Sequence, residues 1–186
     1  MVSDDKLIEG CRNNDRQAQK LLFDKYRPVM FGICLRYGKS RDEAEDVLME
    51  AFMTIFSEIH NFRKEGSLES WMKRIMINSS INNYRKNLKH YFHADIEDVD
   101  DRTMLAENEA VDSTSTKDVL KIVQELPEGY RMVFNLYALE GYKHREIAKM
   151  LNITVGTSKS QLSKARKILQ EKVKLNDTQN SKLYKL

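Results

Sequence analysis

Apolar residues recur at intervals of three and four along most of this chain of 186 residues, and they do not alternate with polar residues. Intervals of three and four place side chains on one face of an α-helix, so this pattern predicts helices. Residues that break helices are scarce, because the chain holds only 7 Gly and 2 Pro. We therefore expect an all-α fold built from amphipathic helices.

The segment 41–59 is predicted to form a helix with one apolar face, which carries Ala44, Val47, Leu48, Ala51, Phe52, Ile55 and Ile59. The opposite face carries Asp42, Asp46, Met49 and Met53, flanked by Glu45 and Glu50. Flexible methionine side chains among carboxylates are typical of an adaptable surface that binds a basic protein partner. An ordinary solvated face is an equally good interpretation of these residues alone.

A further helix is predicted from Ser70 to Lys86. Its apolar face is formed by Ile77, Ile81 and Tyr84, and another face carries polar side chains at intervals of four, four and three: Arg74, Asn78, Asn82 and Arg85. An asparagine amide can donate to and accept from a base, and an arginine can hold phosphate or stack on an unpaired base. A polar surface without a ligand is the alternative interpretation. Trp71 is expected in the core, and residues 61–70 form the loop that leads into the helix.

The C-terminal part of the chain carries a helix-turn-helix pattern. Two short amphipathic helices are expected over 119–137, with a break at Leu126–Pro127 because proline disfavours helical geometry in the residue before it. A helix follows over about 143–151, and then Asn152, a residue type that tolerates a left-handed turn. Thr154 is predicted to cap the next helix. Two helices of this size joined by a short turn are the arrangement of many DNA-binding domains.

The second helix of this motif has an apolar side and a basic side. The apolar side carries Leu162, Ala165 and Leu169, and the other carries Ser160, Ser163, Lys164 and Lys167, with Thr157 at the edge. Hydroxyl and ammonium groups can reach base edges and phosphate oxygens in the major groove of DNA. A basic helix face by itself is more often a solvated surface, but the preceding helix and turn favour DNA binding here.

The net charge of +3 is an average over three unlike segments. Residues 1–86 hold 15 basic and 13 acidic residues, 87–116 hold 2 and 8, and 117–186 hold 14 and 7. The middle segment is acidic, poor in helical periodicity and closed by a Ser/Thr cluster, which predicts a linker. We therefore expect two small helical domains, 1–86 and 117–186, joined by an acidic linker, and the excess of basic residues in the second domain suits a phosphate-bearing partner.

Several functional classes are excluded by features that the sequence lacks. No run of about 18 apolar residues could span a membrane, and the acidic start MVSDDKLIEG does not fit a signal peptide, so we expect a cytoplasmic protein without membrane insertion. Cys11 and Cys34 fit no metal-ligand spacing and are expected to be reduced and partly buried. His90 and His93 have no third ligand nearby. Since phosphate-binding loops and nucleophile motifs are also absent, we expect no enzyme, no metal and no cofactor.

The segment from Leu126 to Leu169 resembles region 4 of bacterial sigma factors of the extracytoplasmic-function (ECF) group, and it reads LPEGYRMVFNLYALEGYKHREIAKMLNITVGTSKSQLSKARKIL. The resemblance implies binding to the −35 promoter element. It places Lys159, Ser160, Ser163 and Lys164 at DNA-contacting positions and Thr157 and Arg166 at phosphate contacts, and Lys167 completes the predicted −35 set. Ser158 stands on the buried side where the family usually has Val, and Gln161 stands where it usually has a basic residue.

The stretch from about Leu7 to Lys86 resembles region 2 of the same group. Its acidic segment EAEDVLMEAF corresponds to the part that binds core RNA polymerase, which implies contacts through Asp42, Asp46, Met49, Glu50 and Met53. The helix that follows corresponds to the part that engages the −10 element, which implies contacts through Arg74, Asn78, Asn82 and Arg85. The loop at 62–70 is expected to capture an unstacked base of the non-template strand. Met49 stands where Gln is common, and Asn82 where Asp is common.

The resemblance implies an alternative sigma factor that binds core RNA polymerase, recognises promoter DNA and opens the −10 element to start transcription. No segment matches the additional domains of housekeeping sigma factors, as is typical of the compact ECF group. The resemblance also allows an anti-sigma factor as a partner. A stand-alone helix-turn-helix regulator that acts without polymerase is the alternative, because the C-terminal region taken alone fits both functions.

Overall fold

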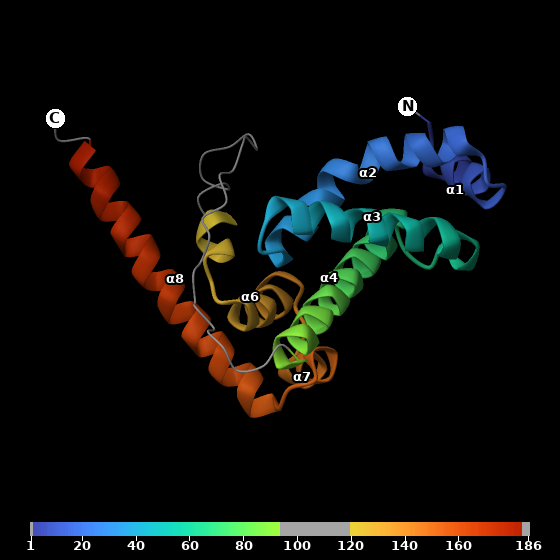
Figure 1. Cartoon of the computed structure of the whole chain (residues 1–186). Coiled ribbons are helices and arrows are strands. Elements are labelled where there is room, and N and C mark those ends of the chain that lie inside the picture. Colours follow the sequence, from blue (N-terminus) through green and yellow to red (C-terminus); the bar gives the residue numbers. More distant parts are fainter. Residues whose placement is uncertain (1, 94–119, 184–186) are drawn as a thin grey trace. The chain divides into compact units, whose positions relative to one another are not determined.

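A computed structural model of the chain describes the backbone of residues 2–93 and 120–183, and the side chains of residues 2–88 and 120–174. Every regular element in these residues is a helix, which confirms the predicted all-α fold. The chain divides into two compact units, unit 1 (Met1–Asp95) and unit 2 (Ile96–Leu186), which are treated separately below (Figure 1).

The described part of unit 1 contains α1 (Asp4–Arg12), α2 (Arg16–Tyr37), α3 (Arg41–Glu58), the 3₁₀ turn η1 (Ile59–Asn61) and α4 (Leu68–His93). Three of these helices begin where a side-chain oxygen accepts a backbone N–H of the first turn. The capping pairs are Asp15–Gln17, Ser40–Glu43 and Ser67–Ser70, with oxygen–nitrogen distances of 2.8, 3.1 and 3.1 Å. Each cap satisfies an N–H group that the start of a helix leaves unpaired, so the caps set where the helices begin.

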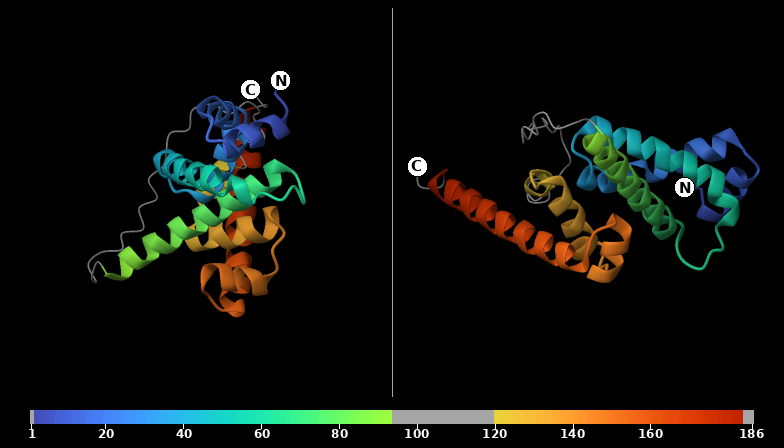
Figure 2. Two further views of the ribbon diagram at one scale, coloured as in Figure 1. Left: turned by 90° about the vertical axis from the view of Figure 1, so that its right-hand side faces the viewer. Right: turned by 60° about the horizontal axis from the view of Figure 1, so that its bottom comes forward.

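The core of unit 1 lies between α2, α3 and α4, which pack against one another side by side, while α1 packs on α2 (Figure 2). The face of α3 that was predicted to be apolar is buried over its whole length, from Ala44 to Ile59. At its centre Phe52 is 1% exposed, and its ring centroid lies 4.6 Å from that of Phe23 in an edge-on arrangement. Burial of this face leaves the opposite face of α3 toward solvent.

Unit 2 begins, within the described residues, with a helical segment at 120–124, followed by α6 (Glu128–Phe134), the π-helical turn η2 (Asn135–Leu139), α7 (His144–Leu151) and α8 (Val155–Leu183). The predicted break at Leu126–Pro127 is confirmed. Arg131 in α6 is only 3% exposed, and its guanidinium donates to the backbone carbonyls of Gln124 at 2.8 Å and Leu126 at 3.3 Å. A buried arginine thus satisfies carbonyl groups at the end of the segment before the proline.

The turn between α7 and α8 has the predicted geometry. Asn152 adopts a left-handed conformation with φ of 55°, and the N–H of Ile153 donates to the carbonyl of Ala148 at 3.0 Å. Thr154 Oγ1 accepts the N–H of Thr157 at 2.9 Å, which confirms the predicted cap of the following helix. The chain therefore passes from α7 to α8 within three residues, 152–154, and the two helices pack on each other.

Two predicted helix ends differ from the structure. Helix α4 begins at Leu68, before the predicted Ser70, because Ser67 caps it. The same helix continues to His93, seven residues beyond the predicted domain end at 86, and residues 94–116 of the predicted linker lie outside the described residues. Helix α8 extends to Leu183 and projects beyond α6 and α7 (Figures 1 and 2).

The predicted burial of Trp71 is wrong. Its side chain is half-buried in the first turn of α4, and its ring packs on that of Phe62 with centroids 5.2 Å apart. The core position one residue further along is filled by Met72, which is 0% exposed. The indole therefore covers the edge of the core instead of filling it.

Candidate functional site

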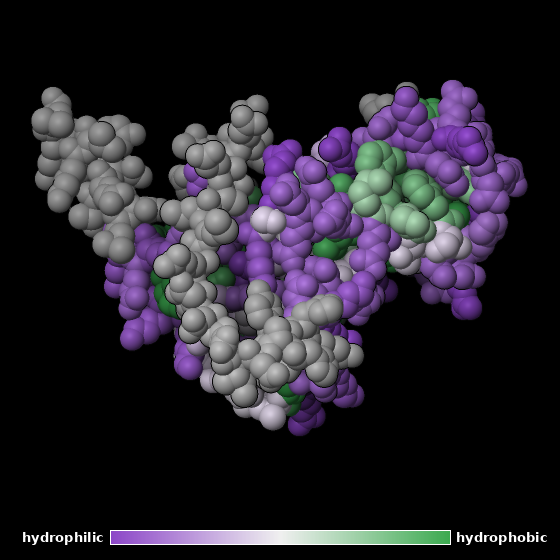
Figure 3. Space-filling model, viewed as in Figure 1, coloured by the Kyte–Doolittle hydropathy of each residue, from purple (hydrophilic) through white to green (hydrophobic). Residues whose placement is uncertain are grey.

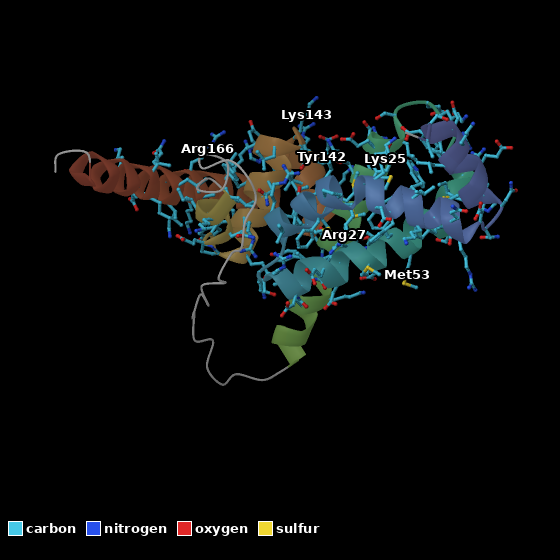
Figure 4. The ribbon with its side chains drawn as sticks, turned by 90° about the horizontal axis from the view of Figure 1, so that it is seen from above. Lys25, Arg27, Met53, Tyr142, Lys143 and Arg166 are labelled. Carbon is cyan, nitrogen blue, oxygen red and sulfur yellow. The ribbon has the colours of Figure 1, made fainter. Side chains whose placement is uncertain are left out.

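The N-terminal half of α8 has one buried face and one exposed face. Ser158, Leu162 and Ala165 are buried, as α8 packs on α6 and α7. The exposed face carries six of the seven residues predicted for the −35 element, namely Lys159, Ser160, Ser163, Lys164, Arg166 and Lys167, and Thr157 lies half-buried at its edge. Arg166 is seen projecting from α8 in Figure 4. The structure therefore brings this set together on one surface of one helix.

Aromatic side chains of α6 and η2 lie close to two cations of this face. The Lys164 Nζ lies 5.9 Å from the ring centroid of Tyr130, and the Arg166 Cζ lies 5.6 Å from that of Tyr137. At such distances the face of an aromatic ring attracts a positive charge. His144, the first residue of α7, stacks on Tyr137 with ring centroids 4.6 Å apart. These contacts restrict the conformations of the two long cationic side chains.

The same surface borders an open cavity of about 420 Å³, lined by Tyr137, His144, Lys159, Leu162, Ser163, Arg166, Lys167 and Gln170. Three of the lining residues are Lys or Arg and none is acidic, so the cavity suits an anionic group. Sequence reasoning missed Tyr137 and His144 as parts of this surface, because neither belongs to α8. Ser158 is a polar residue on the buried side of α8, and a buried hydroxyl needs a polar partner, so this serine is the sequence signal that could have indicated a residue such as His144.

A part-buried hydrogen bond connects α7 and α8 behind this surface. Ser158 is 0% exposed, and its Oγ lies 2.9 Å from Nδ1 of His144. Burial lowers the pKa of His144 below its usual 6.5, and the positive charges of Lys159 and Arg166 lower it further. The imidazole is therefore neutral at neutral pH, and its Nδ1 can accept the Ser158 hydroxyl hydrogen. The hydroxyl that replaces the usual Val is thus satisfied.

The exposed face of α3 carries all of the residues predicted to bind core polymerase, namely Asp42, Asp46, Met49, Glu50 and Met53. Met49 is 54% exposed and Met53 is 72% exposed. A hydrophobic patch interrupts the hydrophilic surface of unit 1 in Figure 3, and Figure 4 shows Met53 pointing outward from α3. Large apolar side chains that stand in solvent beside carboxylates are typical of a surface that binds another protein.

The carboxylates of α3 differ in what they contact. Glu43 accepts hydrogen bonds from the side-chain amides of Asn83 at 2.7 Å and Asn87 at 2.9 Å, so it ties α3 to α4. Glu50 forms an ion pair with Lys86 of α4 at 3.1 Å. Both partners of that pair are exposed, and such pairs contribute at most about 1 kcal/mol, so Glu50 can exchange Lys86 for a basic partner at little cost.

Three of the four residues in the polar stripe predicted on α4 are exposed on the surface. Arg74, Asn78 and Asn82 are exposed, whereas Arg85 is half-buried. The predicted apolar face is confirmed by the burial of Ile77, Ile81 and Tyr84. An extended strand of nucleic acid could therefore meet two amides and one guanidinium along about two turns of the helix.

The loop before α4 is held at both ends and exposed between them. Phe62 is 6% exposed and Leu68 is 3% exposed, whereas every residue at 63–67 is exposed. Lys64 within this loop has a left-handed backbone, with φ of 59°. The half-buried indole of Trp71 lies against Phe62 at one end of the loop. Of the predicted base-capture segment 62–70, residues 62–67 thus form a short exposed arch with fixed ends, and residues 68–70 belong to α4.

Other predicted absences can be compared with the described residues. Among these, no three His, Cys, Asp or Glu side chains are grouped so that they could hold a metal ion. No helix in the described parts of the chain has the length and apolar character needed to cross a membrane. Cys11 and Cys34 are free cysteines in the structure, and both are fully buried instead of partly buried. The side chains of His90 and His93 lie outside the described residues.

Comparison with known families gives two matches in the order of the two units. Residues 22–90 match the family model of Sigma-70 region 2, and residues 116–169 match that of Sigma-70, region 4. The matches span 69 and 54 residues, which together make 123 of the 186. The region 2 match covers α3, the loop at 62–67 and the exposed stripe of α4, and the region 4 match covers the helix-turn-helix and the basic face of α8. A stand-alone helix-turn-helix regulator would account for the match to region 4 alone, whereas this chain also matches region 2.

Curated relatives match almost the whole chain. The ECF RNA polymerase sigma-E factor of Haemophilus influenzae is 29% identical over 182 residues, covering 92% of this chain and 96% of the relative. The RNA polymerase sigma-H factor of Pseudomonas aeruginosa is 28% identical over 184 residues, covering 90% of this chain and 92% of the relative.

Among solved structures, the sigma factor RpoE of Bartonella quintana, in complex with the anti-sigma factor NepR, is 23% identical with a TM-score of 0.49. The similarity covers 83% of this chain and 96% of that one. The two region matches and the nearly full-length relatives agree with each other and with the sequence resemblance. The chain therefore belongs to the ECF group of the sigma-70 family and is an alternative sigma factor that acts in promoter-specific transcription initiation.

Proposed function

We propose that this sigma factor acts through three surfaces, one for core RNA polymerase, one for the −10 element and one for the −35 element, and that it makes and breaks no covalent bond. The observation that carries this proposal is the face of α8. A contiguous set of basic and hydroxyl side chains stands exposed on a helix whose reverse side is buried, directly after a tight helix-turn-helix turn.

At the −35 element, the N-terminal half of α8 enters the major groove. Lys159, Ser160, Ser163 and Lys164 meet the bases, while Thr157, Arg166 and Lys167 hold phosphates. Hydroxyl and ammonium groups suit these two tasks, because base edges and phosphate oxygens offer hydrogen-bond acceptors at short range. The ring contacts of Lys164 and Arg166 leave less side-chain freedom to be lost on binding, which favours affinity.

Core polymerase binds the exposed face of α3. Asp42 and Asp46 provide negative charge that attracts a basic partner and orients it. Met49 and Met53 provide apolar area that is removed from water when the partner arrives. Charge and apolar area on one face together give both a rapid encounter and a lasting complex.

At the −10 element, the loop at 62–67 receives one extruded base, and Arg74, Asn78 and Asn82 hold the adjacent strand. Extruding a base costs a few kcal/mol. Stacking on side chains returns about 1–3 kcal/mol per base. Contacts along the stripe therefore have to contribute as well before the strand stays open.

The two DNA surfaces act in one complex. Once one unit is bound, the other meets its element at a high effective concentration, so the distance between the two elements affects binding as well as their sequences. The place of action is the cytoplasm, where RNA polymerase and promoter DNA are found. An anti-sigma factor is a further proposed partner, because the family resemblance allows one.

The surfaces can be separated by run-off transcription with purified core polymerase. We expect transcription only when this chain is added, and we expect the double variant Asp46→Lys/Glu50→Lys to lose polymerase binding while unit 2 stays folded. Glu9→Lys, an exposed charge reversal on α1, is the matched control and should bind normally. Normal polymerase binding by the double variant would contradict the assignment of α3.

The −35 surface is tested by Lys164→Ala, with Lys121→Ala as an exposed lysine of unit 2 outside the proposed surface. The first variant should weaken promoter-specific transcription, and the second should not. Equal activity of both variants on every promoter would contradict the role of α8.

A further inference from the structure

Helix α1 precedes the matched sigma region 2, which begins at residue 22, and none of the three proposed surfaces includes it. It is nevertheless fixed firmly on α2. Asp4 accepts hydrogen bonds from the Lys25 ammonium at 2.6 Å and from the Tyr26 hydroxyl at 2.8 Å. At Gly10 the two helices approach so closely that an added Cβ would lie 2.4 Å from the Cβ of Ala18. The position of α1 is therefore well defined within unit 1.

The last residue of α1 reaches the exposed loop before α4. Arg12 donates through Nη2 to the backbone carbonyl of Phe62 at 2.7 Å and through Nε to that of Ile59 at 3.3 Å. These two carbonyls lie at the beginning of η1 and directly after its end, so one planar guanidinium spans the turn that leads into the loop. The partners are 47 and 50 residues away in sequence, and this contact is therefore tertiary.

The first turn of α1 makes a second contact with the same loop. Lys64, whose backbone is left-handed, forms an ion pair with the exposed carboxylate of Asp5. The pair is solvent-exposed, so it adds little stability by itself. It does place α1 on both the entry and the middle of the arch, and α1 also packs on η1, which precedes the arch.

We propose that α1 positions the base-capture loop, and that Arg12 is the positioning residue: it holds the Ile59 and Phe62 carbonyls so that residues 63–67 are already arranged to receive an extruded base. This inference rests on the proposed capture of a base by this loop. A binding site that is arranged in advance loses less conformational freedom when the ligand arrives, so its affinity is higher. Arg12 itself touches no nucleotide in this proposal.

The test uses the full chain assembled with core polymerase. A promoter is first found by run-off transcription, and single-stranded oligonucleotides with its non-template −10 sequence are prepared. The affinity of the complex is measured for the intact oligonucleotide and for variants in which each position is made abasic in turn. The position at which base removal weakens wild-type binding most is the captured base. The ratio of the two affinities measures base capture alone, because a general folding or polymerase-binding defect lowers both affinities together.

Arg12→Leu keeps the aliphatic packing and removes both donors. We expect this variant to lose about tenfold of the intact-to-abasic ratio, equivalent to 1.4 kcal/mol, with unchanged binding to the abasic strand. Arg12→Gln keeps a single amide donor and should give an intermediate ratio, which preserves the test if the leucine variant fails to fold. Arg16→Leu is the matched control, since Arg16 stands exposed at the start of α2 and takes no part in the contacts of Arg12 with the loop, and its ratio should equal that of wild type.

Two results would contradict different parts of this inference. If wild type shows no position at which removing a base matters, the proposed base capture itself is wrong. If wild type discriminates but the Arg12 variants discriminate equally well, or if Arg16→Leu loses as much as they do, Arg12 is not the positioning residue.

Discussion

Met53 allows the polymerase-binding surface to be tested through a single side chain. It is 72% exposed, the highest value among the large apolar side chains of the described residues. Burying a whole methionine side chain is worth about 1.5–3 kcal/mol, so burying the part that stands in solvent corresponds to about 1–2 kcal/mol. Met53→Gln preserves the length and helix propensity of the side chain and removes this gain. The affinity for core polymerase should therefore fall about 5- to 30-fold.

The affinity is measured by fluorescence anisotropy, with labelled chain titrated by core polymerase. Met53→Leu keeps the apolar area and should bind within about twofold of wild type, because exchanges between Leu and Met change little in hydrophobicity or volume. Both variants should unfold in urea within about 0.5 kcal/mol of wild type, because the side chain is exposed in the free chain. Wild-type affinity of the glutamine variant, or an equal loss in both variants, would refute burial of apolar area as the cause.

Three further predictions concern the stability and chemistry of the two units. Asn152→Gly should leave the free energy of unfolding unchanged or raise it, whereas Asn152→Val should lower it by about 1–2 kcal/mol, because φ at this residue is 55°. Urea unfolding measures both variants, and equal effects would contradict the left-handed turn. Burial raises the pKa of Cys11 to about 11, aided by the charge of Asp15, and that of Cys34 to about 12, so neither thiol should react with DTNB at about pH 8 until urea is added. Folding lowers the pKa of His144 below 6.5, so below pH 6.5 the unfolded chain binds a proton more readily than the folded chain. The contribution of His144 to stability is therefore complete above pH 6.5 and is lost as the pH drops through the pKa of the folded state. His144→Gln should flatten that part of the profile of stability against pH, and identical profiles would contradict the shift.

Features that depend on local spacing were predictable from the sequence. The two faces of α3 follow from apolar residues at intervals of three and four, and burial from Ala44 to Ile59 agrees with them. Asn152 and Thr154 are residue types with specific roles at a helix end and a helix start, so the turn between α7 and α8 could be placed to the residue. The basic face of α8 then follows from the start of the helix, because each further residue turns by a known angle.

Features that depend on contacts with residues elsewhere in the sequence could not be predicted. Trp71 is half-buried and packs on Phe62, while Met72 lies in the core, and a single aromatic residue on a helix does not indicate which of two neighbours will be buried. Arg131 is buried because carbonyls of the preceding segment lie within its reach, although an arginine is normally expected on the surface. Arg12 reaches carbonyls about 50 residues away, and no local pattern records that contact.

The hydrogen bond between Ser158 and His144 also limits how descendants of this chain can change. Removing one partner of a buried hydrogen bond strands the other and costs about 1–3 kcal/mol, whereas replacing both partners by apolar groups of similar shape can be almost neutral. The Ser158 hydroxyl is buried and His144 is half-buried, so loss of His144 strands the hydroxyl, whereas a valine at 158 alone removes only the partner of the imidazole. Two positions 14 residues apart, on separate helices, are therefore expected to change in a preferred order, with Ser158 replaced before His144.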